Sequence, residues 1–204
     1  MSEPIEPTVF VVDDDRGVRN SIRELLISVG LAVETFESAQ SFLETFDPAR
    51  RGCLILDIRM AHMSGLALEA KLAEIGADLP IVFISGHGDI SMAVNAIKRG
   101  AVDFVPKPYH EQQLLDAVNE ALRRDESRCR AALDGDRLTE RAHKLTARER
   151  QVLDLALRGH SSKVIARELG ISHRTVELHR SNLLEKLGIA SITELLRLKR
   201  GNGI

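Results

Sequence analysis

The first half of the chain alternates short apolar runs with amphipathic stretches. Compact runs rich in β-branched residues cover residues 8–13, 52–57, 80–85 and 102–106, and a weaker alternating run covers residues 31–36. The segments between them carry apolar residues at helical spacing, such as Val18, Ile22 and Leu26. Five strands that alternate with five helices predict an α/β doubly wound parallel sheet, because parallel strands need helical crossovers that cover both faces.

The second half of the chain carries no strand pattern. Short amphipathic patterns there predict helices over residues 146–158, 162–169, 173–187 and 192–200. Thr146 and Glu149 are spaced as a capping box, and Gly159, Gly170 and Gly188 stand where helices would end. This half is therefore predicted to be a small all-α domain.

The segment between the two halves is highly charged and keeps only a weak helical period. It is either an extension of the preceding helix or a linker, and the pattern leaves both open. We predict a first domain over residues 1–124, a connecting segment over residues 125–143 with or without helical structure, and a second domain over residues 144–204.

The distribution of charge separates the two halves further. The 204 residues have a formal net charge of only −2. Residues 1–125 contain 12 Lys and Arg against 20 Asp and Glu, a net charge of −8, whereas residues 126–204 contain 16 against 10, a net charge of +6. This asymmetry suggests a polyanion as the partner of the second half.

Composition disfavours several classes of protein. No apolar run reaches the ~18 residues that a membrane span requires, and the first seven residues lack the cationic and apolar regions of a signal peptide. We therefore expect a soluble, cytoplasmic protein without a membrane partner. Cys53 and Cys129 show no spacing typical of a zinc site or a disulfide framework, so we expect both to be reduced.

Acidic residues follow two of the predicted strands. Asp13, Asp14 and Asp15 come directly after the first strand, and Asp57 ends the third. Because the carboxyl ends of neighbouring parallel strands meet at one edge of the sheet, Asp13, Asp14 and Asp57 are expected to share a pocket. Their mutual repulsion favours a divalent cation with oxygen ligands, Mg²⁺ or Mn²⁺. Asp15 is expected at the start of the following helix, where a negative charge is favourable.

Two further polar residues are expected at the same edge of the sheet. Ser85 ends the fourth predicted strand and Lys107 follows the fifth. A metal ion, a hydroxyl and an ammonium group around one carboxylate are suited to stabilise a phosphoryl group on that carboxylate. Each of these residues alone is also typical of a solvated turn or a helix cap, so the prediction depends on their joint placement at four strand ends.

Four motifs carry a resemblance to the receiver domain of two-component response regulators. They are VVDDD at 11–15, LDIRMAHMSG at 56–65, SGHGD at 85–89 and DFVPKP at 103–108, in the order and spacing of that family. The resemblance covers residues 8 to about 124. It implies a flavodoxin-like receiver fold in which Asp57 is the phosphoacceptor.

The same resemblance implies roles for the neighbouring residues. Asp13, Asp14, Asp57 and the main-chain carbonyl of Arg59 would hold Mg²⁺, while Ser85 and Lys107 would contact the phosphoryl oxygens. Phe104 would be the switch aromatic, the peptide bond from Lys107 to Pro108 would be cis, and Arg59 and His87 would tune the lifetime of the acyl phosphate.

One departure from the receiver pattern concerns the loop after the third strand. The family usually has proline after the methionine of this loop, whereas Ala61 follows Met60 here. Without the restraint of a following proline, the loop is expected to be looser, although the metal contact through Arg59 can persist. Tyr109 after Pro108 is a minor change.

In the second half, a short turn containing Gly170 joins two helical patterns, which is the arrangement of a helix-turn-helix. At 100° per residue, Val176, Leu183 and Leu187 share one face of the second helix, and Leu178 lies on the opposite, polar face. Leu178 either packs on a neighbouring helix or meets a thymine methyl group in a major groove. Glu177 is placed to accept a hydrogen bond from a cytosine amino group.

Residues 145–189 resemble the LuxR/FixJ type of DNA-binding domain over their whole length. The resemblance implies that the helix from His173 enters the major groove and that Glu177, Leu178 and Ser181 face the bases. Candidate contacts to DNA phosphates are Lys163, Arg174, Thr175, His179, Arg180 and Lys186. The helix over residues 192–200 matches one through which such domains often dimerise.

These features predict a transcription factor that is switched by phosphorylation and is not an enzyme. A sensor histidine kinase would phosphorylate Asp57, the receiver would dimerise through residues 89–124, and the homodimer would bind double-stranded operator DNA, with RNA polymerase as a further candidate partner.

Two alternatives stay open. A hydrolase would use Asp57 as a transient nucleophile, although Arg59 stands where its general acid is expected. A constitutive DNA-binding protein would use the receiver only as a dimerisation scaffold.

Overall fold

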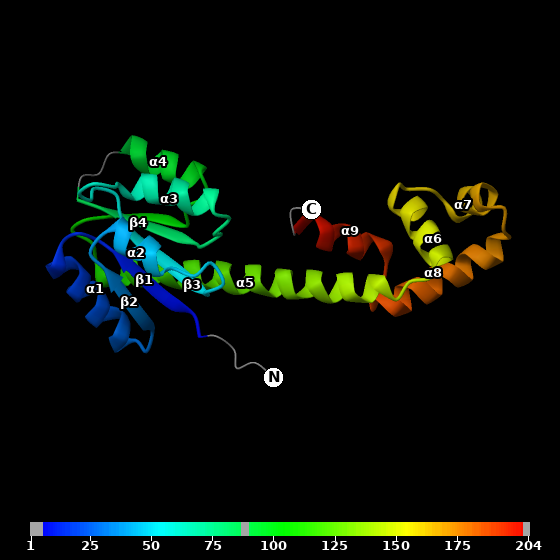
Figure 1. The fold of residues 1–204 in the computed structure, drawn as a ribbon, viewed down its shortest axis with the longest axis horizontal. Coiled ribbons are helices and arrows are strands. Elements are labelled where there is room, and N and C mark those ends of the chain that lie inside the picture. The colour runs from blue at the N-terminus through cyan, green and yellow to red at the C-terminus, as the bar shows by residue number, and fades with distance from the viewer. Residues whose placement is uncertain (1–5, 87–89, 202–204) are drawn as a thin grey trace. The chain divides into compact units, whose positions relative to one another are not determined.

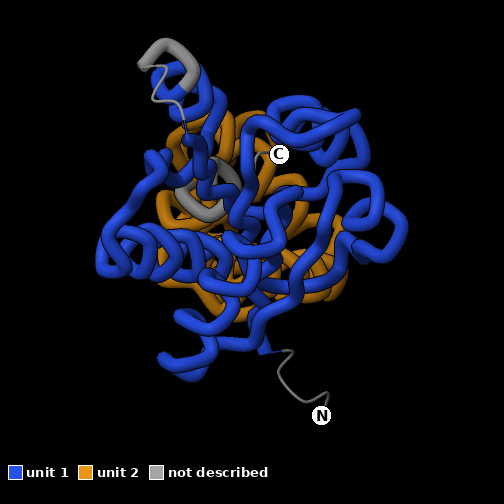
Figure 2. Tube along the Cα trace, turned by 90° about the vertical axis from the view of Figure 1, so that its left-hand side faces the viewer, with its two compact units in different colours: residues 1–127 blue, residues 128–204 orange. Residues whose placement is uncertain are grey.

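The chain folds into two compact units, Met1–Ser127 and Arg128–Ile204, called unit 1 and unit 2 below (Figures 1 and 2). The structure is a computed structural model that describes residues 6–86 and 90–201. No helix in this described part combines the length and apolarity that a membrane crossing needs.

Unit 1 contains a five-stranded parallel sheet in the order β2-β1-β3-β4-β5. The strands are β1 (Thr8–Val12), β2 (Ala32–Phe36), β3 (Gly52–Asp57), β4 (Ile81–Ser85) and β5 (Asp103–Pro106). Every residue of β1, β3 and β4 is buried, which explains why these segments are continuous apolar runs. The predicted doubly wound sheet is confirmed.

Helices cover both faces of this sheet (Figure 1). One face packs against α2 (Ala39–Thr45), α3 (Gly65–Glu74) and α4 (Ile90–Lys98), and the other against α1 (Arg16–Ser28) and α5 (Glu111–His143). Gly52 begins β3 where a Cβ atom would lie 1.8 Å from the carbonyl oxygen of Thr8, so only glycine allows this close pairing with β1.

Helix α5 extends beyond unit 1. It continues without interruption to His143, so residues 125–143 are helical, which decides between the two conformations left open above. Leu114 and Val118 are buried in the core of unit 1, whereas Leu138 and Ala142 pack against the core of unit 2.

Unit 2 contains α6 (Ala147–Leu157), α7 (Ser162–Leu169), α8 (His173–Leu187) and α9 (Ile192–Gly201), close to the predicted bounds. The capping box of α6 is present: the Thr146 hydroxyl accepts from the Glu149 amide at 3.2 Å, and the Glu149 carboxylate accepts from the Thr146 amide at 2.8 Å. Gly170 and Gly188 end α7 and α8 in the left-handed conformation.

Candidate functional site

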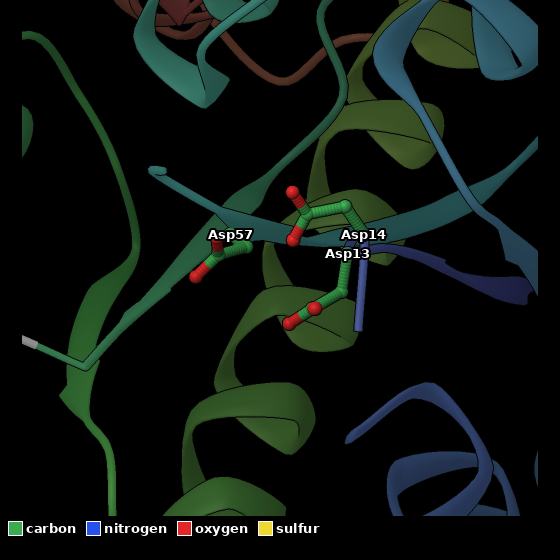
Figure 3. Close-up of side chains that lie close together, drawn as sticks. All are labelled: Asp13, Asp14 and Asp57. Atoms are coloured by element: carbon green, nitrogen blue, oxygen red, sulfur yellow. The ribbon is translucent and has the colours of Figure 1, made fainter. Parts of the chain in front are cut away.

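Three carboxylates converge at the carboxyl edge of the sheet (Figure 3). Asp13 follows β1 and Asp57 ends β3, and the neighbouring register of these strands brings the two side chains together. One carboxylate oxygen from each of Asp13, Asp14 and Asp57 lies within 4.8 Å of the others. Asp13 is 0% exposed and Asp57 5% exposed, whereas Asp14 is open to solvent. This oxygen-rich set fits a divalent cation that also contacts water.

Lys107 connects two of these carboxylates. Its Nζ lies 2.5 Å from Asp13 Oδ2 and 3.0 Å from Asp57 Oδ1. Burial raises the pKa of Asp57, the hydrogen bond from Lys107 lowers it, and the net shift is upward. Burial lowers the pKa of Lys107, but its hydrogen bonds to the two carboxylates raise it above the ordinary value, so this ammonium is charged at neutral pH.

The other residues expected near the carboxylates lie at neighbouring strand ends. Ser85 is buried at the end of β4, and its carbonyl accepts a hydrogen bond of 2.7 Å from the Lys107 amide. The peptide bond from Lys107 to Pro108 is cis, as the resemblance implied. Phe104 on β5 is partly buried against the core beneath α2, α3 and α4. Arg59 is exposed in the loop after β3, and His87 lies outside the described residues.

The side chain of Asp15 caps a helix and is not part of the cluster formed by Asp13, Asp14 and Asp57. Its side chain accepts from the amides of Gly17 and Val18 at 2.7 and 3.2 Å and forms the N-cap of α1. These backbone hydrogen bonds lower the pKa of Asp15. The expected position of Asp15 at the start of a helix is confirmed.

Two groups that position the carboxylates were missed by sequence reasoning. Arg19 Nη1 donates to the Asp13 carbonyl at 2.7 Å, and the amide of Ala61 donates to Asp14 Oδ2 at 3.1 Å. Proline at position 61 could not make the second bond because it has no N–H. Ala61 therefore ties its loop to Asp14, which opposes the looseness expected from the missing proline. The absent proline was the only sequence signal for this contact.

A second candidate surface lies on α8 in unit 2. Val176, Leu183 and Leu187 are buried, as their spacing predicted. Leu178 is 59% exposed, so it does not pack on a neighbouring helix of unit 2, and Glu177 and Ser181 are exposed on the same helix. An apolar side chain on an exposed polar face suits contact with a base edge.

The residues expected to contact DNA phosphates differ in their surroundings. Lys163 and Arg174 are exposed, and His179 is partly exposed. Arg180 Nη1 donates to Ser162 Oγ at 3.2 Å, and the Thr175 amide donates to Ser172 Oγ at 3.0 Å within the N-terminal cap of α8.

Lys186 has a structural partner in unit 2. Its Nζ lies 2.9 and 2.8 Å from the two carboxylate oxygens of Glu149. Glu149 is buried at the first turn of α6 and needs a cation, so Lys186 compensates a charge inside the domain. The Lys186 side chain is still 37% exposed, so it remains a candidate phosphate contact.

Both units match known families. Residues 9–119 match the response regulator receiver domain, and residues 143–199 match the luxR family of bacterial regulatory proteins. The chain is 46% identical over 190 residues to the response regulator protein TodT of Pseudomonas putida, covering 93% of this chain and 84% of TodT. It is 42% identical over 190 residues to the transcriptional regulatory protein FixJ of Azorhizobium caulinodans, covering 93% and 90%.

Solved structures of similar proteins cover nearly the whole chain. The response regulator StyR is 48% identical and superposes with a TM-score of 0.73 over 96% of this chain and 99% of that one. Full-length FixJ from B. japonicum is 36% identical, with a TM-score of 0.59 over 98% of both chains. The similarity therefore includes the order of the two units as well as each fold.

Proposed function

The chain belongs to the two-component response regulators that carry a LuxR-family DNA-binding domain, and from this premise we propose that phosphorylation of Asp57 by a sensor histidine kinase switches its binding to DNA. The proposed input domain covers residues 1–124, the output domain covers residues 144–204, and residues 125–143 connect them. The convergence of Lys107 on the carboxylates of Asp13 and Asp57 is the observation that carries the proposal.

In the proposed reaction, a carboxylate oxygen of Asp57 attacks the phosphorus of a phosphohistidine. The P–N bond breaks, a P–O bond forms, and the histidine nitrogen leaves with the electron pair. Lys107 and the hydroxyl of Ser85 bind phosphoryl oxygens, and Phe104 responds to the movement of Ser85. Asp13, Asp14, Asp57 and the carbonyl of Arg59 would hold Mg²⁺ or Mn²⁺, which when bound neutralises charge on the phosphoryl group.

The proposed output is DNA binding by a homodimer. Phosphorylation shifts the receiver to a form that dimerises through the face made by residues 89–124, and RNA polymerase is the partner that such a dimer would recruit. Glu177, Leu178 and Ser181 would contact base edges, and Lys163, Arg174, Thr175, His179, Arg180 and Lys186 would contact phosphates. The cytoplasm is the compartment that this function requires.

The substitution Asp57→Asn tests the phosphoacceptor. The full chain is incubated with Mg²⁺ and a small phosphodonor such as acetyl phosphate, and incorporated phosphate is measured. We expect labelling of the native protein and of Asp116→Asn, which removes an equal charge from the exposed face of α5, but not of Asp57→Asn. Stable incorporation into Asp57→Asn would exclude Asp57 as the acceptor.

A DNA-binding comparison separates this proposal from constitutive binding. The operator affinity of the phosphorylated and unphosphorylated full chain is measured at one fixed salt concentration. Tighter binding after phosphorylation supports the switch, whereas equal affinities would favour a receiver that serves only as a dimerisation scaffold.

A further inference from the structure

The last turns of α5 belong structurally to unit 2. Leu138 and Ala142 pack against the core formed by α6, α7, α8 and α9. The same helix places Leu114 and Val118 in the core of unit 1. One continuous helix therefore contributes side chains to both hydrophobic cores, and its C-terminal end is held by specific contacts within unit 2.

The first of these contacts is made by Arg141. Its Nη1 donates to the carbonyl oxygen of Leu187 at 3.0 Å. Leu187 is the last residue of α8, and a carbonyl at this position has no partner within its own helix. A cation at a helix C-terminus also interacts favourably with the helix dipole. Arg141 therefore caps the end of the helix whose other residues are proposed to read DNA.

Gly188, the residue after Leu187, leaves room for the guanidinium group of Arg141. Gly188 has φ +66°, and a Cβ atom built there would lie 2.3 Å from Arg141 Nη1. Glycine at this position therefore permits both the left-handed turn that ends α8 and the close approach of Arg141. The turn and the arginine form one packed arrangement.

A second arginine holds α5 itself. Arg150 Nη2 on α6 donates to the carbonyl oxygen of His143, the last residue of α5, at 3.3 Å. Lys186, next to Leu187, binds Glu149 on α6. Contacts among α5, α6 and α8 thus meet at the C-terminal end of α8.

We propose that Arg141 is a positioning residue for DNA recognition, which fixes the C-terminal end of α8 to the helix that continues from the receiver. A change in the receiver would then reach α8 through α5 and this contact. The second part of the inference rests on the proposed phosphorylation switch, whereas the first part does not.

Hydrogen exchange on the full chain tests the contact itself. Arg141→Met removes the guanidinium, and Arg137→Met is a matched control one turn earlier, where the side chain is 69% exposed and 3.7 Å from Asp134. We expect amides at residues 138–145 to exchange about tenfold faster in Arg141→Met than in the native chain, because a hydrogen bond from a charged group is lost. Arg141→Lys, which keeps a cation, should recover part of the protection. Equal exchange in the Arg141→Met and Arg137→Met variants would overturn the inference.

DNA binding tests the role in recognition, and the operator probe is a duplex selected by the native full chain from DNA of random sequence. We expect Arg141→Met to bind the operator about tenfold more weakly than Arg137→Met, and to lose most of the affinity gain that phosphorylation produces. Equal affinities of the two variants would reduce Arg141 to a structural role and contradict the proposal. If phosphorylation does not raise the operator affinity of the native chain, the proposed switch fails. The difference in operator affinity between Arg141→Met and Arg137→Met still decides whether Arg141 positions α8.

Discussion

The reactivity expected of Asp57 depends on its immediate neighbours. Burial and the charges of Asp13 and Asp14 favour the protonated acid, while the hydrogen bond from Lys107 favours the carboxylate. Only the ionised carboxylate is a nucleophile. Lys107 therefore contributes before any phosphoryl group is present, by keeping a larger fraction of Asp57 ionised.

The substitution Lys107→Met should therefore change the pH dependence of phosphorylation. Removal of the ammonium raises the pKa of Asp57 further, so the acidic limb of the labelling profile should move to higher pH, and labelling at neutral pH should fall. The measurement is incorporation of phosphate from acetyl phosphate as a function of pH. Lys71→Met, on the exposed surface of α3, should leave the profile in place. An unshifted profile in Lys107→Met would show that Lys107 does not control the ionisation of Asp57.

On α8, exposed residues are expected to divide into those that read sequence and those that add affinity. Leu178→Ala should weaken operator binding by about 1 kcal/mol and relax the preference at one base pair, because the contact with a base edge is lost. Lys163→Ala should weaken binding to all sequences alike and reduce the slope of log K against log salt by about 1. The measurement is the affinity of each variant for operator DNA and for scrambled DNA over a range of salt concentrations. It distinguishes the base-reading role of Leu178 from the phosphate-binding role of Lys163. Equal losses on both DNAs in Leu178→Ala would contradict its proposed role.

The residues at the carboxylate cluster show how far sequence reasoning reaches. Asp13, Asp57 and Lys107 were expected together because each lies at the carboxyl end of a strand, and these ends share one edge of a parallel sheet. The amide of Ala61 was not expected against Asp14, because every residue except proline has an amide N–H, and the missing proline does not indicate an acceptor 47 residues away. The partner of Lys186 could not be predicted for a similar reason, because Glu149 lies beside it only when α6 and α8 pack together.

At the scale of elements, secondary structure could be predicted where the apolar residues show a strong helical or strand period, and it stayed undecided where that period is weak. In unit 2, side-chain caps begin α6 and α8, and Gly170 and Gly188 end α7 and α8, so the bounds of these helices were predicted within two residues. The distal part of α5 has a weak apolar period and contains Gly135, which left its conformation open. Ion pairs along the helix, such as Arg124 with Glu120 at 3.2 Å, add only weak support, and the decisive packing of Leu138 and Ala142 is tertiary.

The contact between α6 and α8 gives a test at this scale. Burial raises the pKa of Glu149, but hydrogen bonds from Lys186 and Thr146 bring it below the ordinary value of 4.5. Because the folded-state pKa is lowered, this ion pair stabilises unit 2 above about pH 4.5, and the stabilisation is lost as the pH falls through the folded-state pKa.

The substitution Glu149→Gln keeps an acceptor for the Thr146 amide but removes the charge facing Lys186. We expect unit 2 to lose about 1 kcal/mol at pH 7, a modest value because the Lys186 side chain is 37% exposed and solvent screens the pair. Urea unfolding at pH 7 and at lower pH measures this, and the difference from the native protein should shrink as the pH falls. Glu185→Gln on the exposed side of α8 is the control. A difference that does not depend on pH would point to packing instead of charge.

At the scale of the whole molecule, the net charge of −2 conceals two domains of opposite sign. The acidic half includes the carboxylates that are proposed to bind a cation and accept a phosphoryl group. The basic half includes the exposed cations that are proposed to meet DNA phosphates. A joined acidic domain lowers the attraction of the whole chain to DNA, because the DNA experiences the charges of both domains.

This charge division predicts how removal of the receiver changes DNA binding. Residues 128–204 contain a hydrophobic core of their own and carry a positive net charge, so this fragment should bind non-specific DNA more tightly than the unphosphorylated full chain at low salt. The difference should shrink between about 50 and 200 mM salt, because the Debye length falls below about 8 Å and the added ions screen the charges of the acidic domain. Fluorescence anisotropy with labelled DNA of random sequence measures both affinities. If the difference stays constant over this range, electrostatic repulsion is not its cause.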